Sequence, residues 1–582
     1  MALTEDLPAL LTRDGRQIGN PDIAVYVTDL FRAARQHRRP MVGKWTRNYN
    51  VLQNRTWGTR DQHLPSPEIP EIYPVLATIT SWQTDSQPTF ECAPYAPPHS
   101  DYYTEMAGLA QDMQTVLQAN WVLNDSDAEI EKILWDGNTY GIGIGKVTWD
   151  ARAWGGLGDA VLRRVDPYTW YADPQARSME DASYFVEAKV VSAQELEARY
   201  PGALSKVSPG SSEAEESPTF LKNTTSPTYP KANPGTIDGS TTPTWGLPGQ
   251  TNRIDPTSDP GYLLIEAWLK TPVKIGDKWT DTWRLVAVVG NVVLRDVSAY
   301  KMWGHGQHPY IRYVPHDTGE FYGFSLVEML TSAQLSINRL LAAMEQNVWL
   351  TGNPILVASA RANLQRGVVT NRPGTQLNPS NAEDVKWMEP PQGAPALSSD
   401  LVRFYIDQME RISGMSAIVR GATMTGRNAQ GVVDSMQEAA FVRIRMSLRN
   451  LERFLRRAGN LTASLIAEFY DASRIVPFVG PDGARRSMVL HNQHFYRPSA
   501  DGTRLPTAFH IKVEAGSMLP TSKQARAAEA QSLYALGAID VEGLLDAMDY
   551  PNRQAIIQRV QAQQMQAGTL GMPPTQRAAA RR

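Results

Sequence analysis

The sequence predicts a mainly helical α+β fold that is divided into three or four structural modules. A chain of 582 residues is too long for a single compact core. Strand-like alternation is concentrated in residues 262–297, whereas long amphipathic helical patterns fill 325–350 and 431–470. No apolar run approaches the roughly 20 residues that cross a bilayer, so we expect no membrane contact.

The N-terminal part is expected to alternate helices with strands. Helical spacing occupies 21–38, which ends in basic residues, and 100–122, where Ser100 and Asp101 are candidate caps. A helix over 126–136 precedes NTYGIGIGKVTWD, whose alternation predicts a strand. Residues 203–260 hold nine prolines and few aliphatic residues. We therefore expect an exposed excursion that is at most partly ordered.

Further along, three strands are predicted at YLLIEAWLK, WRLVAVVG and NVVLRDV, with Gly290-Asn291 as a tight-hairpin signal. The helix over 325–350 would be about 39 Å long at ~1.5 Å per residue. Residues 351–396 indicate a compact strand–helix–strand module bounded by Pro and Gly. The remaining predicted elements are helices at 397–414 and 431–470, short strands within 474–515, and closing helices at 521–536, 540–548 and 551–566.

Composition narrows the possible functions. The chain has 57 basic and 60 acidic residues, a net charge of −3. Tight DNA binders usually carry a basic excess, because phosphate neutralisation supplies most of their affinity. A high-affinity DNA-binding protein is therefore not expected, although a surface past which DNA slides is compatible with this charge. Fifteen tryptophans and 22 tyrosines suit large packed or inter-subunit surfaces.

The terminus and the cysteine count limit the chemistry further. Residues 1–17 carry early acids and no apolar signal-peptide core, which indicates cytoplasmic synthesis. The single cysteine, Cys92, excludes an intramolecular disulfide and a cysteine-built metal site. Its simplest interpretation is a small buried apolar residue.

Enzyme motifs are not convincing. GIGIGK at 141–146 lacks the Walker spacing, because position 140 is Tyr140 and Lys146 is followed by Val147; a glycine-bearing strand is the preferred interpretation. The pairs His305 and His308, and His491 and His494, have no clear carboxylate set beside them for a metal. We expect no enzyme activity and no cofactor.

Three stretches resemble the portal proteins of tailed bacteriophages. The densest, 309–345, joins a proline-bearing strand to Tyr-Gly-x-Ser and a long helix containing Gln and Asn-Arg. The second is MERISGMSAIVRGATMTGRNAQGVVDSMQEAA, a helix, a Gly-rich break and a long helix. The third is VEAGSMLPTSKQARAAEAQSLYALGAID. The elements follow one another as helix, small module, helix, loop and long helix. This order is similar to that of the portal family over residues 20–550.

The resemblance implies a ring, commonly of twelve subunits, that forms the channel for packaging and ejection of double-stranded DNA at one capsid vertex. Such proteins are built from wing, stem, clip and crown. The corresponding segments here are a wing at 1–321 (with the insertion 203–260) and 431–515, stem helices at 322–350 and 397–413, a clip at 351–396, a tunnel loop at 414–430, and a crown at 516–582.

The resemblance also implies the partners. They are further copies of the chain, double-stranded DNA, the terminase large subunit, a head-tail adaptor or neck protein, the major capsid protein and the scaffold. The protein would reside in the virion after assembly in the host cytoplasm. A neck or tail ring protein that is not the portal is the alternative, and it would lack the order of elements described above.

The loop 414–430 is the first candidate site. Its glycines free the backbone, and its arginines could touch DNA phosphates without reading bases. Composition alone favours an ordinary surface linker, whereas the resemblance favours a DNA channel. The candidate channel residues are Arg420, Thr423, Thr425, Arg427 and Asn428.

A basic face on the helix 431–470 is the second candidate. At ~100° per residue its arginines fall within about 120°, and Glu452 is a candidate partner for Arg449 or Arg456. The face could be solvated or salt-bridged, could meet acidic groups of the next subunit, or could line the lumen; we rank subunit contact above DNA contact. Its members are Arg445, Arg449, Arg453, Arg456 and Arg457.

The clip is the third candidate. Its extended pieces, GNPILVA and DVKWMEP, could pair edge-to-edge with a neighbour or a partner. Trp387 and Met388 suit a docking anchor and a core position equally well. The candidate docking surface comprises Arg361, Arg366, Arg372, Lys386, Trp387 and Met388.

Overall fold

In the computed structural model of the protein, the chain forms two compact units, residues 1–515 and 516–582. Helix exceeds strand among the described residues, which agrees with the predicted α+β class. In that part of the chain no helix is long and apolar enough to span a membrane. The described residues are 22–57, 64–85, 88–94, 101–207, 261–275, 278–352, 355–359, 361, 385–388, 394–415, 429–470, 474–479, 485–490, 495–498, 504–506, 509–513, 530–536 and 543–545.

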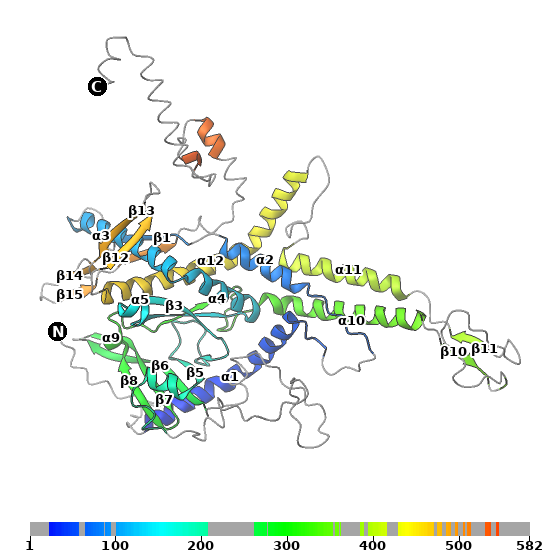
Figure 1. Ribbon diagram of the computed structural model, residues 1–582, viewed down its shortest axis with the longest axis horizontal. Coiled ribbons are helices and arrows are strands. Elements are labelled where there is room, and N and C mark those ends of the chain that lie inside the picture. Colours follow the sequence, from blue (N-terminus) through cyan, green and yellow to red (C-terminus); the bar gives the residue numbers. More distant parts are fainter. Residues whose placement is uncertain are drawn as a thin grey trace, which may run out of the picture. The chain divides into compact units, whose positions relative to one another are not determined.

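Four helices open the first unit (Figure 1): α1 (Ile23–Leu52), α2 (Ile72–Thr84), α3 (Asp101–Leu123) and α4 (Ser126–Tyr140). The predicted end of the first helix at residue 38 is wrong, because α1 continues through Pro40. A proline inside a helix costs about 3 kcal/mol. Burial beyond the proline offsets that cost: Trp45 packs against Tyr168 and Tyr322.

A small sheet follows α4. Strand β2 (Gly143–Asp150) lies between β3 (Asp159–Val165) and β9 (Tyr310–Tyr313). The glycine-bearing strand predicted for 141–146 is therefore confirmed from Gly143 onward, whereas Gly141, with a φ of 84°, ends α4. Two short helices interrupt the strands along the chain. Helix α5 (Ala153–Gly156) lies between β2 and β3, and α9 (Ala299–Met302) directly precedes the loop that leads to β9.

A five-stranded antiparallel sheet has α1 on one face, and a short helix and the three-stranded sheet on the other. Its strands lie in chain order: β4 (Trp170–Ala172), β5 (Tyr184–Val191), β6 (Tyr262–Ile275), β7 (Lys278–Val289) and β8 (Val292–Ser298). One face covers Val27 and Phe31 of α1, and the other covers Leu196 of α6 (Ala193–Arg199). The predicted hairpin at Gly290-Asn291 is confirmed, and Gly290 has a φ of 58°.

A helical hairpin follows the sheets. Helices α10 (Leu326–Gly352) and α11 (Ala394–Ser413) lie side by side (Figure 1), and between them in sequence β10 (Ile355–Ala358) pairs antiparallel with β11 (Val385–Met388). Both predicted helices and both predicted strands are thus confirmed. The helix predicted between the two strands lies outside the described residues.

The last elements of the first unit are α12 (Ala429–Phe469) and short strands. The strands predicted within 474–515 are confirmed as β12 (Arg474–Val479), β13 (Arg485–Leu490), β14 (Tyr496–Pro498), β15 (Arg504–Pro506) and β16 (Phe509–Val513). Strand β16 pairs with β1 (Phe90–Pro94), where Cys92 is buried as predicted. Burial and the charge of Glu91 raise the pKa of the Cys92 thiol to about 12.

The second unit is described only in part. Residues 530–535 and 543–545 are helical, within two of the predicted closing helices. The predicted helix at 551–566 lies outside the described residues. In the first unit, the same holds for residues 208–260, which are nearly all of the predicted excursion.

One buried ion cluster joins the two sheets. Glu187 of β5 and Glu266 of β6 are directly opposite in the sheet register and are 4% and 6% exposed. Like charges in that arrangement repel. Lys146 of β2 places its Nζ 2.6 Å from Glu187 Oε2 and 3.4 Å from Glu266 Oε2. Tyr200 and Tyr310 donate hydrogen bonds to Glu266 and Glu187 respectively.

The cation decides the protonation of this cluster. Burial is the largest single effect and would raise the pKa of both carboxyls. Lys146, helped by Lys189 at Glu187, by Arg199 at Glu266 and by hydrogen bonds, outweighs it, so both pKa values lie below their ordinary range. Burial likewise lowers the pKa of the Lys146 ammonium, and the two carboxylates reverse that effect to give a net rise. All three groups are therefore charged at neutral pH.

We predict that Lys146→Met lowers the free energy of unfolding by about 3 kcal/mol, because two facing buried carboxylates keep only Lys189 and Arg199 nearby. Lys132→Met is the matched control: Lys132 pairs with Glu129 at 2.8 Å but is 57% exposed, so the loss should stay below about 1 kcal/mol. Denaturant unfolding monitored by tryptophan fluorescence measures both.

The pH dependence has a definite sign. In the wild type the lowered carboxyl pKa values contribute stability that is present above the unfolded pKa of about 4.3 and is lost as the pH falls below it. In Lys146→Met, burial raises those pKa values, so protonation relieves the repulsion on acidification. The stability gap between the two proteins should narrow from pH 7 to pH 5, and a constant gap would contradict this account.

Candidate functional site

Helix α12 has the two faces that its sequence predicts. On one side Ile444, Leu448 and Leu451 are buried. On the other side Arg457 is half-buried, and the other four predicted arginines are exposed: Arg445, Arg449, Arg453 and Arg456. The pKa of Glu452 is raised by burial, while Arg449 lowers it, but no ion pair joins Glu452 to Arg449 or Arg456 among the described residues.

The small sheet fixes the position of α12. Phe454 is buried over Gly145 of β2, where an added Cβ would lie 2.8 Å from the Phe454 Cζ atom. The Asn450 side chain donates a hydrogen bond of 3.0 Å to the carbonyl oxygen of Val314. A glycine at 145 is therefore needed for the close approach of helix and strand.

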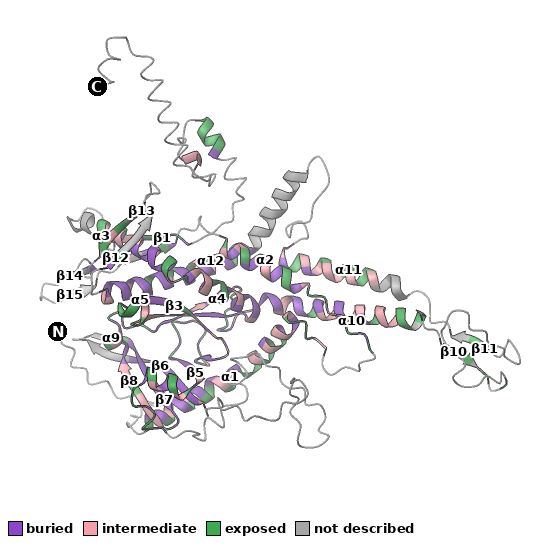
Figure 2. Cartoon of the chain, in the orientation of Figure 1, coloured by how far each residue is buried: buried purple, intermediate pink, exposed green. Residues whose placement is uncertain are grey.

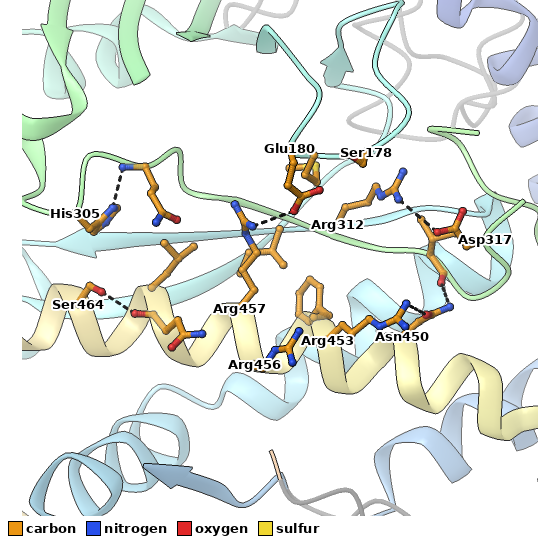
Figure 3. A pocket seen from close by; sticks show the side chains of 17 residues that line it. Ser178, Glu180, His305, Arg312, Asp317, Asn450, Arg453, Arg456, Arg457 and Ser464 are labelled. Carbon is orange, nitrogen blue, oxygen red and sulfur yellow. Dashed lines mark hydrogen bonds and ion pairs between the residues drawn. The ribbon is translucent and has the colours of Figure 1, made fainter. Parts of the chain in front are cut away.

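A groove of about 700 Å³ runs along the basic side of α12 (Figure 3). Residues 178–180 and 305–317 form its other walls. Its cationic side chains outnumber the carboxylates of Glu180 and Asp317. The cations are Arg312, Arg453, Arg456 and Arg457.

Arg457 is half-buried but only weakly compensated. Its Nη1 lies 3.3 Å from Glu180 Oε1, but the Glu180 side chain is 70% exposed, which weakens the attraction. Its Nη2 lies 3.4 Å from His308 Nε2, and its buried Nε has no hydrogen-bond partner among the described residues. Burial lowers the pKa of Arg457 and Glu180 only partly opposes this. The groove can therefore accept a further carboxylate.

The histidines beside the groove do not resemble metal ligands. His308 is buried against Trp283 and Phe185, and burial followed by the charge of Arg457 lowers its pKa well below the ordinary value. Burial lowers the pKa of His305 to about 4. The described residues contain no group of three His, Cys, Asp or Glu placed to hold a metal. His491 and His494 lie outside the described residues.

The clip residues are described only in part. Arg361 and Lys386 are exposed. Trp387 and Met388 lie on β11 opposite Leu356 and Ile355 of β10, so these two extended pieces pair with each other. Arg366 and Arg372 lie outside the described residues.

The tunnel-loop candidates also lie outside the described residues: Arg420, Thr423, Thr425, Arg427 and Asn428. The structure describes only the entry to this loop. There Gly414, with a φ of 78°, ends α11 and donates a hydrogen bond of 2.8 Å to the carbonyl of Glu410.

Sequence reasoning missed two walls of the groove. Glu180 and Asp317 lie in loops and Arg312 lies on β9, and no periodic pattern in the sequence links any of them to α12. Arg312 donates a hydrogen bond of 2.7 Å to the carbonyl of Phe321 and lies 3.9 Å from Asp317. Only the folded chain brings these residues to α12.

A comparison with known families decides the identity. The model of the phage P22-like portal proteins matches residues 47–581. The chain belongs to this family. Portal proteins are structural proteins of the capsid vertex that serve DNA packaging and the attachment of the tail, and in general they contact copies of themselves, the capsid, the terminase and DNA. No curated protein matches the sequence of this portal protein.

We predict that Gly145→Ala destabilises the portal protein by about 1–3 kcal/mol, because the new methyl group would push Phe454 away from the sheet. Gly108→Ala in α3 is the matched control. It has open space around it and should instead stabilise the helix by about 0.5–1 kcal/mol. Thermal unfolding compares the two, and equal effects would show that Gly145 does not set the position of α12.

Proposed function

We propose that copies of this portal protein close head-to-tail into a ring around the DNA, with the α10–α11 hairpin as the stem. The observation that carries this proposal is a set of large apolar side chains that are exposed on the hairpin. Exposed positions along the chain are green in Figure 2. A subunit on its own would leave these apolar side chains in water, whereas neighbours in a ring would cover them. They are Val348, Trp349, Leu401, Phe404 and Ile412.

The hairpin also supports the assignment of the neighbouring segments. Helix α10 has 27 residues, so it is about 40 Å long at ~1.5 Å per residue. The stem would comprise 322–350 and 397–413, and the clip would be 351–396, which includes the β10–β11 pair. The terminase large subunit would dock on the clip first and the head-tail adaptor later. The wing, 1–321 and 431–515, would face the capsid protein and scaffold, and 516–582 would form the crown.

The tunnel loop, 414–430, would contact DNA loosely. Tight binding at each phosphate would create a barrier at every step of translocation, and a chain of net charge −3 avoids that barrier. Arg420 and Arg427 would provide two positive belts around the channel. The motor would be a separate protein, so we infer that the portal itself catalyses no reaction.

The groove along α12 suits a subunit contact. A ring needs two different complementary faces on each subunit. The groove offers a cationic face, and a carboxylate from the next subunit would compensate Arg457, whose present partner Glu180 is largely exposed. A neck or tail ring protein that is not the portal is disfavoured, because the portal family model covers nearly the whole chain.

We predict that Phe404→Glu shifts the protein from rings to smaller species, because a carboxylate would replace a side chain that is 53% exposed on the isolated subunit and would be buried in a ring. Val122→Glu, at a residue 57% exposed on α3, is the control and should leave rings intact. Electron-microscope images and sedimentation velocity measure the outcome. Wild-type protein that stays monomeric at high concentration would contradict the ring itself.

Deletion of residues 419–428 should spare ring assembly and impair DNA packaging or retention, because it removes the proposed belt residues Arg420 and Arg427 while leaving α11 and α12 in place. An in vivo complementation assay that counts DNA-filled capsids measures packaging. Images of the purified variant separate a packaging defect from an assembly defect. Normal packaging by the deletion variant would refute a working tunnel loop.

A further inference from the structure

A second basic cavity, of about 710 Å³, lies between the three-stranded sheet and the five-stranded sheet. Its volume is within the range of about 300–1,000 Å³ that is usual for ligand sites. We propose that this cleft binds an extended acidic segment of a partner protein. The site shares no residue with the groove along α12, so it does not depend on the proposed ring contact.

The charge of the cleft is strongly unbalanced. Seven Lys and Arg side chains line it against two carboxylates, Glu187 and Glu266. Four of the seven cations have carboxylate partners: Lys146, Lys189 and Arg199 pair with the two glutamates, and Arg164 pairs with Asp136. The other three are exposed and have no ion pair among the described residues: Arg163, Arg295 and Lys301.

One of these cations lies on a strand with an unpaired edge: Arg295 is on β8, which pairs only with β7 among the described strands. Arg163 lies on β3, whose outer edge is covered by side chains, because the backbone N–H of Arg164 donates to Glu129 and the carbonyl of Ala160 accepts from Asn120. Lys301 follows β8 on α9. A free strand edge can form backbone hydrogen bonds with an extended peptide, which a nucleic acid cannot do. The edge of β8 therefore favours a peptide.

The apolar part of the cleft also suits a peptide. Trp268 stacks on Trp303 at 5.3 Å between ring centroids, and Trp149 stacks on Phe469 at 5.0 Å. In an extended segment successive side chains point to opposite sides. Acidic residues at alternate positions would face the three cations, and apolar residues between them would contact the aromatic rings. A duplex, in contrast, needs an open surface rather than a space between two sheets.

The test uses the full-length assembled protein and a fluorescently labelled hexapeptide of alternating glutamate and valine. Fluorescence anisotropy should show binding to the wild type. The variant Arg163→Gln/Arg295→Gln/Lys301→Gln should bind at least about tenfold more weakly. The matched control loses three arginines from α1 and should bind like the wild type: Arg32→Gln/Arg35→Gln/Arg39→Gln. Equal binding by the cleft variant would overturn the proposal.

Three further comparisons identify the ligand class. A backbone N-methylated peptide of the same sequence should bind more weakly, because it cannot pair with a strand edge, and unchanged binding would refute the pairing. A single-stranded oligonucleotide of equal charge should compete poorly, and stronger competition than by the peptide would assign the cleft to nucleic acid. Binding seen only after Glu213→Gln/Glu215→Gln/Glu216→Gln would assign it to the chain's own acidic run and overturn a partner site.

Discussion

The attraction between one buried ammonium group and two facing carboxylates connects the two sheets of this portal protein. Glu187 and Glu266 are opposite each other on adjacent strands, an arrangement that is unfavourable unless a cation lies between them. Lys146 supplies that cation from the other sheet. Breaking such a cluster is costly because the remaining charges are left buried. The relative position of the sheets therefore depends on strand β2.

Strand β2 also positions α12. Neighbouring residues of a strand point to opposite faces, so Gly145 faces Phe454 of α12 while Lys146 faces the five-stranded sheet. The glycines that superficially suggest a phosphate loop are thus explained by close packing. Gly145 therefore serves the contact with α12 and Lys146 the contact with the five-stranded sheet, and a change at either residue should disturb one contact before the other.

The sequence predicted the parts of this structure that depend on local patterns. The strand at 143–150, the hairpin at Gly290-Asn291 and the two faces of α12 follow from periodicity or turn chemistry. The predicted end of α1 at residue 38 was wrong, because aromatic residues distant in sequence stabilise the helix beyond Pro40. Contacts such as Lys146 with Glu266, 120 residues apart, and Arg457 with Glu180, 277 residues apart, have no local signal. For that reason both basic cavities could be found only in the folded chain.

The distribution of charge reconciles a near-neutral chain with these basic cavities. A net charge of −3 limits long-range attraction to DNA, but exposed arginines on α12 and at the rim of the cleft remain locally positive. Phosphates would compete for them if they stayed open. Carboxylates from a neighbouring subunit in the groove, and from a partner in the cleft, would neutralise them on assembly. The completed portal would then attract DNA less than its free subunits do, which favours translocation over binding.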